Sequence, residues 1–390
     1  MNKDLEYHNI KYRVDRIRGL SFGKTSILMD DNNDSMTTSN ELGKDIRFLL
    51  SKKSLDFTPV IRQLGGQLFY VKSGSTGHTF KSIFPEDEED KEYAVKVVAY
   101  PKKDMYGDLF NSERPENVEI LMLRLLSDFV KNKKTPHIVL PIMTFNTDIQ
   151  TFVDLPKKGL VTNKRYDAFI EKYDNGDFFD KVSILISEWA NGGDLMDYIR
   201  SNYKKFTLKD WRTMFFQLLS VLAVIQYEYP AFRHNDLKAN NILIQKIQKS
   251  NKVYRYDIRG DEIVTTFVVP NIGFLIKIWD FDFACIPGII NNNKVDAEWT
   301  KAINVNPEQN RYYDVHYFFN TFTSKVFFPQ FWEDKRIPQK VKDFVLRIVP
   351  EDYREGKKIS KKGRLLVNDE YKTPEEILRT DKFFKSFRKD

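Results

Sequence analysis

The chain has 390 residues, of which 41% are hydrophobic and 14% aromatic, so it is too apolar for a disordered protein and can bury a sizeable core. Its 62 basic residues exceed the 55 acidic ones only modestly, and charge alone favours acidic partners weakly. The single Cys285 excludes an internal disulfide framework and is typical of a reducing compartment, while the polar start and the lack of a long apolar run predict no signal peptide and no membrane-spanning segment.

The first part of the chain predicts a small strand-rich lobe behind an N-terminal extension. Residues 1–60 are rich in polar and turn residues, with one short helical pattern over 42–50, and we interpret them as the extension. From Gly65 onward, short apolar runs alternate with turns, which is typical of strands. We expect five strands, at 68–71, 79–84, 93–99, 138–143 and 183–188. One helix, which begins near Pro115, is expected between the third and the fourth.

The second part of the chain predicts mostly helices. Thr207 with Asp210 three residues later resembles a capping box, and the apolar stripe over 211–225 indicates one long buried helix. We therefore expect an α+β fold of two lobes. Its expected parts are a small β-rich N-lobe at 61–188 with a polar, basic insertion at 146–180, and a mostly helical C-lobe at 189–390 with a hairpin-like insertion at 245–273.

The strongest chemical signal is the run from His234 to Asn241, which is followed well downstream by Asp280. Phosphoryl transfer needs a carboxylate that accepts a hydroxyl proton, a lysine on the transferring phosphate, and amide and carboxylate oxygens on a metal. Asp236, Lys238, Asn241 and Asp280 supply these four groups in order. Each segment adjoins a β-branched apolar run, which argues against a chance turn rich in Asn and Asp.

Lys96 is a second candidate, because it lies in an expected strand that is otherwise apolar. A lysine in such a strand costs free energy unless it is paired, although an edge-strand lysine that faces water is common. A glutamate on the following helix could be its partner, and Glu119 and Glu116 are the candidates, although either could be an ordinary solvated helix residue.

From residue 68 to residue 384 the chain resembles the eukaryotic-type protein kinases. The run at 234–241 is similar to their catalytic loop, and 280–282 to their metal-binding triplet. The resemblance implies that Asp236 is the catalytic base, that Lys238 neutralises the γ-phosphate, and that Asn241 and Asp280 bind Mg²⁺ or Mn²⁺ together with ATP. It also implies that Lys96, paired with Glu119, holds the ATP phosphates.

The same resemblance assigns further residues to the binding of ATP and to the support of the catalytic loop. The Gly-rich loop at 72–80 would bring backbone amides to the phosphates, although such a run is more often a plain turn. The segment 187–195 looks like the hinge that bonds adenine, and its aspartate is expected to bind ribose, to cap the next helix, or both. The predicted residues are Gly74, Ser75 and Gly77 in the loop, Glu188, Ala190 and Asp194 at the hinge, and His234 and Asp314 as structural anchors.

Three departures from the kinase pattern affect the expected mechanism. No Ala-Pro-Glu motif closes the activation segment, so the peptide-docking platform is in question. Asn235 replaces the arginine that pairs with a phosphorylated activation loop, and regulation by such phosphorylation is not expected. Asp282 replaces the glycine of the triplet, which predicts a triplet that flips less readily.

More narrowly, the segments 280–283, 288–291 and 312–314 resemble the divergent kinase that poxviruses use in virion assembly, and related kinases of other large DNA viruses fit equally well. This implies phosphorylation of serine and threonine, with tyrosine left open, on unidentified virion or host proteins. The expected location is the infected-cell cytoplasm or the virion. No specific nucleic-acid partner is expected.

Two other functions stay open at this point. One is a small-molecule kinase of the choline-kinase or aminoglycoside-phosphotransferase type, which shares similar loops; the other is a pseudokinase scaffold. Among the remaining features, Cys285 is expected to be a buried small residue. The basic runs at 131–134 and 357–364 are expected to be solvated.

Overall fold

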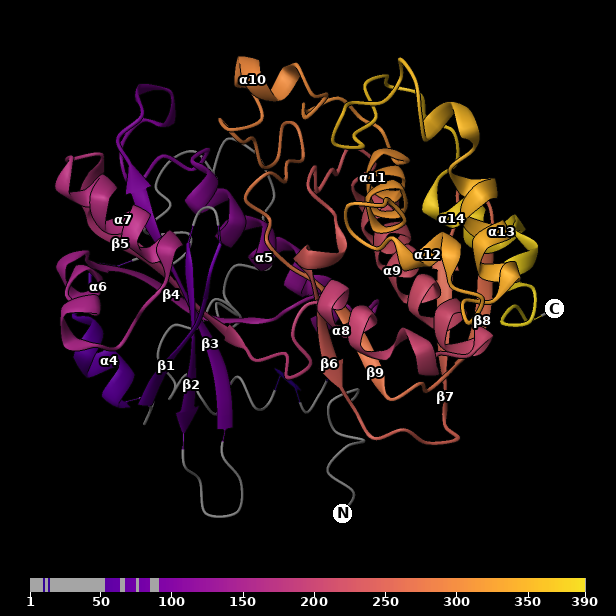
Figure 1. The fold of residues 1–390 in the computed structure, drawn as a ribbon, viewed down its shortest axis with the longest axis horizontal. Helices are drawn as coiled ribbons and strands as arrows, with labels where there is room; N and C mark the ends of the chain where they lie inside the picture. Colours follow the sequence, from indigo (N-terminus) through magenta and orange to yellow (C-terminus); the bar gives the residue numbers. More distant parts are fainter. Residues whose placement is uncertain are drawn as a thin grey trace. The chain divides into compact units, whose positions relative to one another are not determined.

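The computed structural model describes Ile10, residues 13–14, 53–63, 67–74, 77–84 and 91–389. The helical pattern at 42–50 and the predicted site residue Ser75 lie outside the described residues. The chain divides into two compact units (Figure 1). We call residues 14–127 with 139–189 the sheet unit, and residues 1–13, 128–138 and 190–390 the helical unit. The division falls one residue after the expected lobe boundary and assigns 128–138 to the second unit.

The sheet unit contains a five-stranded antiparallel sheet with the order β1-β2-β3-β5-β4. Its strands, indigo to magenta in Figure 1, are β1 Gln67–Ser73, β2 His78–Phe84, β3 Lys91–Pro101, β4 Pro141–Asp148 and β5 Phe178–Glu188. The central strand β3 is buried on both faces over its last eight valine-, alanine- and tyrosine-rich positions before Pro101. The helix α5 Pro115–Lys131 follows β3 in the chain, with a proline in its first turn as expected.

Two expectations for this part of the chain were wrong. The predicted strand at 138–143 begins only at Pro141, because Ile138 makes an isolated bridge to Ile278 instead of joining the sheet. The single predicted helix is accompanied by further helices in the sheet unit, namely α4 Phe57–Gln63, α6 Gln150–Val153 and α7 Lys164–Asp174, with the 3-10 turns η2 Asp104–Tyr106 and η3 Pro156–Lys158. Helix α7 lies in the polar insertion and was not predicted, because only its Tyr166 and Phe169 are buried and it therefore has little apolar periodicity.

The helical unit is built around α9 Leu208–Glu228, most of whose residues are buried. The predicted capping box is present, because the Thr207 hydroxyl accepts from Asp210 N and the Asp210 carboxylate accepts from Thr207 N. The other helices of the unit are α8 Leu195–Asn202, α10 Glu298–Lys301, α11 Tyr313–Phe322, α12 Gln330–Glu333, α13 Gln339–Ile348 and α14 Pro374–Thr380. Its 3-10 turns are η4 Tyr203–Lys205, η5 Ala239–Asn241, η6 Glu351–Tyr353 and η7 Lys382–Phe384.

Two pairs of antiparallel strands complete the helical unit. They are β6 Ile242–Lys246 with β9 Phe274–Ile278, and β7 Val253–Arg259 with β8 Val264–Pro270. The second pair is the hairpin within the expected insertion, and it packs on α9 through Tyr256 and Phe267, whose rings each lie 5.1 Å from Phe216. Across the described residues, no helix combines the length and the apolar character that a membrane crossing requires.

Candidate active site

The catalytic-loop motif of the helical unit is held by Asp314, in the first turn of α11. Its carboxylate accepts hydrogen bonds from the backbone N of His234 at 2.7 Å and of Asn235 at 2.9 Å. Asp314 is fully buried, and this burial raises its pKa, while the adjacent His234 and the two backbone donors lower it in part. The structure therefore places Asp314 where it orients the backbone that leads into Asp236.

The carboxylate of Asp236 has donors at both oxygens. Lys238 Nζ lies 2.7 Å and Asn241 Nδ2 2.9 Å from Oδ2. Arg364 Nη2 lies 2.5 Å from Oδ1. Asp236 and Arg364 are both buried, so the three donors hold the carboxylate in one orientation.

Arg364 was missed by sequence analysis, and the expectation that its basic run is solvated was wrong for this residue. It is 7% exposed, whereas Lys361 and Lys362 beside it are exposed. The contact with Asp236 joins residues that are 128 positions apart. No spacing rule for a helix or a strand reaches that far, so the sequence contains no local signal for it.

The metal-binding triplet motif lies beside the catalytic loop because of strand pairing. In the antiparallel β6–β9 ladder Ile242 is opposite Ile278, so the residue before β6 and the residue after β9 are neighbours. Trp279 N accordingly donates to Asn241 O at 3.2 Å. Asp280 follows with a φ of 68°, a positive value that is uncommon for an aspartate.

Asp282, the residue that replaces the triplet glycine, forms a buried ion pair. Its Oδ2 lies 2.6 Å from Lys294 Nζ, and both side chains are about one-tenth exposed. The same Lys294 ammonium lies 3.7 Å from the ring centre of Phe283. Asp282 is therefore anchored to a later part of the chain.

The sheet unit contains the predicted lysine and glutamate. Lys96 Nζ on β3 lies 2.6 Å from Glu119 Oε1 on α5, with side-chain exposures of 8% and 4%. The alternative partner, Glu116, contacts Arg114 Nε at 3.1 Å. The structure therefore shows that Glu119, and not Glu116, is the ion-pair partner of Lys96, a choice that the sequence left open.

The Gly-rich loop connects β1 and β2. Gly74 N donates to Gly77 O at 2.8 Å, which closes the turn. A Cβ on Gly77 would lie 2.7 Å from Val97 O and 2.9 Å from Val98 Cγ2, so the backbone approaches β3 too closely for a side chain. Burial lowers the pKa of His78, which follows the loop, to about 4.

The predicted hinge residues lie on either side of the point in the chain where the sheet unit ends and the helical unit resumes. In the sheet unit, Glu188 N donates to Leu140 O at 3.0 Å, and Glu188 Oε1 accepts from Leu140 N at 2.9 Å. In the helical unit, Ala190 is buried, and Asp194 caps α8 by accepting from Asp197 N at 3.0 Å.

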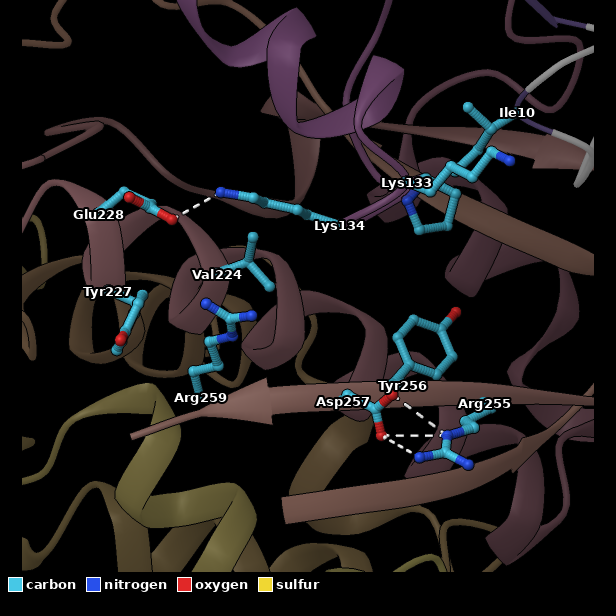
Figure 2. A pocket seen from close by; sticks show the side chains of 11 residues that line it. Ile10, Lys133, Lys134, Val224, Tyr227, Glu228, Arg255, Tyr256, Asp257 and Arg259 are labelled. Atoms are coloured by element: carbon cyan, nitrogen blue, oxygen red, sulfur yellow. Dashed lines mark hydrogen bonds and ion pairs between the residues drawn. The ribbon is translucent and has the colours of Figure 1, made fainter. Parts of the chain in front are cut away.

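A cavity of about 320 Å³ in the helical unit is separate from these residues, since none of the predicted site residues lines it. Figure 2 shows it between α9 and the hairpin strand β7. Two ion pairs lie at its wall, Lys134 with Glu228 at 2.6 Å and Arg255 with Asp257 at 3.1 Å. These pairs neutralise much of the charge at the wall.

A family model described as poxvirus serine/threonine protein kinase matches residues 85–369. The chain belongs to this family. It is a serine/threonine protein kinase, which transfers the γ-phosphate of ATP to protein hydroxyls and uses a divalent metal ion. The match agrees with the two-lobed α+β fold predicted from the sequence, and it favours a protein kinase over a small-molecule kinase.

Relatives from viruses and from a cellular organism are also named serine/threonine-protein kinases. "Putative serine/threonine-protein kinase R400" of Acanthamoeba polyphaga mimivirus is 52% identical over 349 residues, which cover 87% of this kinase and 73% of the relative. "Serine/threonine-protein kinase 2" of fowlpox virus is 25% identical over 261 residues, covering 65% of this kinase and 54% of the relative. "Probable serine/threonine-protein kinase DDB_G0286465" of Dictyostelium discoideum is 32% identical over 102 residues, covering 26% and 8%.

Proposed function

We propose that Asp236 is the residue of this kinase that accepts the proton of the serine or threonine hydroxyl during phosphoryl transfer. The supporting observation is the donor arrangement around its carboxylate, which Lys238, Asn241 and Arg364 hold in one orientation. A fixed base close to the reacting hydroxyl gains most from general-base catalysis. Lys238, with its ammonium beside this carboxylate, is suited to neutralise the transferred phosphate as well.

The divalent ion of this site is proposed to be Mg²⁺, held by Asn241 and Asp280. The amide nitrogen of Asn241 donates to the backbone O and the Oδ2 of Asp236, both at 2.9 Å, which leaves the amide oxygen as the donor atom for a cation. Oxygen donors of this kind suit Mg²⁺, which is usually held by one or two carboxylates together with substrate phosphates. When bound, the ion supplies charge neutralisation on the phosphates.

For ATP, the residues predicted from the sequence are proposed as follows. In the sheet unit, the buried pair of Lys96 and Glu119 would offer its ammonium to the phosphates, and the backbone amides of Gly74, Ser75 and Gly77 are proposed to bind them as well. The backbone of Glu188 and Ala190 would bond adenine. Asp194 would bind ribose while it caps α8, because a carboxylate can accept several hydrogen bonds at once.

The setting that we propose is an infected cell, with virion or host proteins as substrates. Two of the relatives described above come from viruses, and both are named serine/threonine-protein kinases. The single cysteine suits the reducing cytoplasm, and the virion is the second location that fits such a kinase.

Phosphate transfer from γ-labelled ATP tests the proposed role of Asp236. The full chain would be assayed with Mg²⁺ against casein, histone, choline and an aminoglycoside, beside an Asp236→Asn variant. We expect label on serine and threonine of protein, and a kcat lower by about 10²- to 10⁴-fold in the variant. ATP binding should be retained, since Asp236 is proposed to act on the acceptor. A variant with the wild-type kcat would exclude Asp236 as the base, and label on the small molecules alone would exclude protein hydroxyls as the acceptors.

A further inference from the structure

Arg364 lies in a turn, and the backbone carbonyl groups of the residues before and after it both accept side-chain hydrogen bonds. Asn320 Nδ2 donates to Gly363 O at 3.0 Å, and Asn304 Nδ2 donates to Leu365 O at 2.9 Å. Gly363 has a φ of 80°, a conformation that other residues rarely adopt. The backbone on either side of Arg364 is therefore fixed, and the side chain starts from a defined position.

The guanidinium of Arg364 contacts the catalytic loop at two points. Nη2 donates to Asp236 Oδ1 at 2.5 Å, and Nη1 donates to the backbone O of Asn235 and, at 3.2 Å, to Tyr313 Oη. Its carbon lies 4.1 Å from the ring centre of Tyr317. One planar group thus connects the carboxylate of Asp236 to the peptide that precedes it.

The charge on Arg364 persists in this buried place. Burial by itself lowers the pKa of Arg364, but the adjacent Tyr313, Tyr317 and Asp236 raise it, and the net change is upward. A buried ion pair contributes little net stability, because the loss of hydration offsets the attraction between the charges. Stability alone is therefore a weak reason for placing an arginine here.

A lysine could not make the same set of contacts. The ammonium is a point charge, whereas the guanidinium donates in two directions from one plane and stacks on an aromatic ring. At Asp236, Arg364 is the donor to Oδ1, while Lys238 and Asn241 donate to Oδ2. Without Arg364 the carboxylate would keep its donors at Oδ2 and its side-chain hydrogen bond with Tyr317, but it would lose the guanidinium contact at Oδ1.

We propose that Arg364 is a positioning residue for phosphoryl transfer, which holds the Asp236 carboxylate and the Asn235 peptide in the orientation that accepts the proton of the substrate hydroxyl. This inference rests on the proposed role of Asp236 as the base. Arg364 acts through Asp236 and has no direct part in the reaction.

A double-mutant cycle between Arg364 and Asp236 tests the inference. In the wild-type background, Arg364→Gln should lower the kcat for casein about 100-fold, while the KM for ATP and the affinity for the nonhydrolysable analogue AMP-PNP change less than about twofold. Arg364→Lys should restore about a tenth of the wild-type rate, because it returns the charge without the second donor. In the Asp236→Asn background, Arg364→Gln should cost less than about threefold, since residues that act as a unit are not additive.

The matched control is Lys362→Gln, which removes a charge from an exposed position of the same turn and should leave kcat unchanged. Equal losses in the two Asp236 backgrounds would show a purely structural role, and a faster Arg364→Gln enzyme would show that Arg364 blocks the acceptor; both results overturn the inference. If Arg364→Gln fails to fold, the cycle is run with Arg364→Lys. A wild-type rate for Asp236→Asn alone would instead refute the proposed function.

Discussion

At the scale of single residues, several strained backbone conformations occur in or beside the motifs of the candidate site. Four non-glycine residues among those described have a positive φ, namely Lys133, Asn235, Asp280 and Asn304. Asn235 and Asp280 belong to the two catalytic motifs, and Asn304 holds the turn that carries Arg364. Such conformations cost on the order of 1 kcal/mol each and persist only where neighbours impose them. At Asn235 the neighbours are identified, because Asp314 accepts from its backbone N.

Asp282 provides a prediction at this scale. Because its carboxylate neutralises Lys294, Asp282→Gly should leave a buried ammonium unpaired and destabilise the protein by about 3 kcal/mol. It should also loosen the triplet, since glycine restores backbone freedom. Urea unfolding measures the first effect, and hydrogen exchange of the amides of Phe281 and Phe283 measures the second.

The double variant Asp282→Gly with Lys294→Met is the control for this experiment. It should regain most of the lost stability, because no unpaired charge remains, while its exchange stays fast. If Asp282→Gly exchanges at the wild-type rate, Asp282 does not restrain the triplet and the idea of a less readily flipped triplet fails.

At the scale of elements, α7 supports the base of the Gly-rich loop. Its Tyr166 and Phe169 rings lie 4.3 Å and 4.8 Å from the His78 ring on β2, and Arg165 Nη1 donates to Ser73 O at 3.2 Å. Both ends of the loop, the last residue of β1 and the first residue of β2, therefore contact this helix. Within the sheet unit, the inserted helix therefore packs against the strand ends that flank the loop.

Substitutions at two glycines of this loop distinguish a role in packing from a role in phosphate binding. Gly77→Ala should destabilise the protein by about 1 to 3 kcal/mol, because its Cβ would collide with Val97 O and the Val98 side chain. Gly74→Ala should leave stability unchanged, since the nearest atom to its Cβ is Gly77 O at 3.6 Å. If the loop amides bind phosphate, Gly74→Ala should nevertheless raise the KM for ATP about tenfold.

Thermal unfolding and steady-state kinetics on the two variants check this prediction. Each glycine serves as the matched control for the other, because both changes add one methyl group to the same turn. Unchanged ATP kinetics in Gly74→Ala would count against a phosphate-binding role for this loop, and a normal Tm in Gly77→Ala would count against the close approach of its backbone to β3.

At the scale of the whole molecule, burial lowers the pKa of a histidine in each of the two units. Burial lowers the pKa of His78 in the sheet unit and of His316 in the helical unit from 6.5 to about 4. His316 Nε2 also lies 2.6 Å from Tyr353 O, which raises its pKa in part. An unfolded chain binds protons at both residues between pH 6.5 and 4, whereas the folded chain does not.

The expected consequence is a loss of stability in acid. Because the folded pKa lies below the unfolded one, the contribution is complete above pH 6.5 and is lost as the pH falls towards 4. By pH 5 each histidine should have cost on the order of 2 kcal/mol. Urea unfolding at pH 7.5, 6 and 5 measures this loss, and His78→Phe and His316→Gln should each flatten the curve. A pH dependence that persists unchanged in both variants would assign the effect to other groups.

Much of the architecture was predictable from short stretches of sequence. The capping box at Thr207, the strand around Lys96 and the buried stripe of α9 depend on residue types within a few positions of one another. The strand predicted at 138–143 begins three residues later, because Ile138 pairs with Ile278 instead, and no local pattern reports such a partner. Helix α7 was missed because only two of its side chains are buried.

The sequence by itself determined the order of the catalytic motifs and thereby the class of chemistry, because phosphoryl transfer needs particular residue types at short spacings. Only the tertiary structure decided which glutamate pairs with Lys96, and that Arg364 reaches Asp236 across 128 positions. The physical reason is that a side chain's long-range partner depends on how distant segments pack. A basic run therefore looks the same in the sequence whether its last arginine faces water or holds the carboxylate of Asp236.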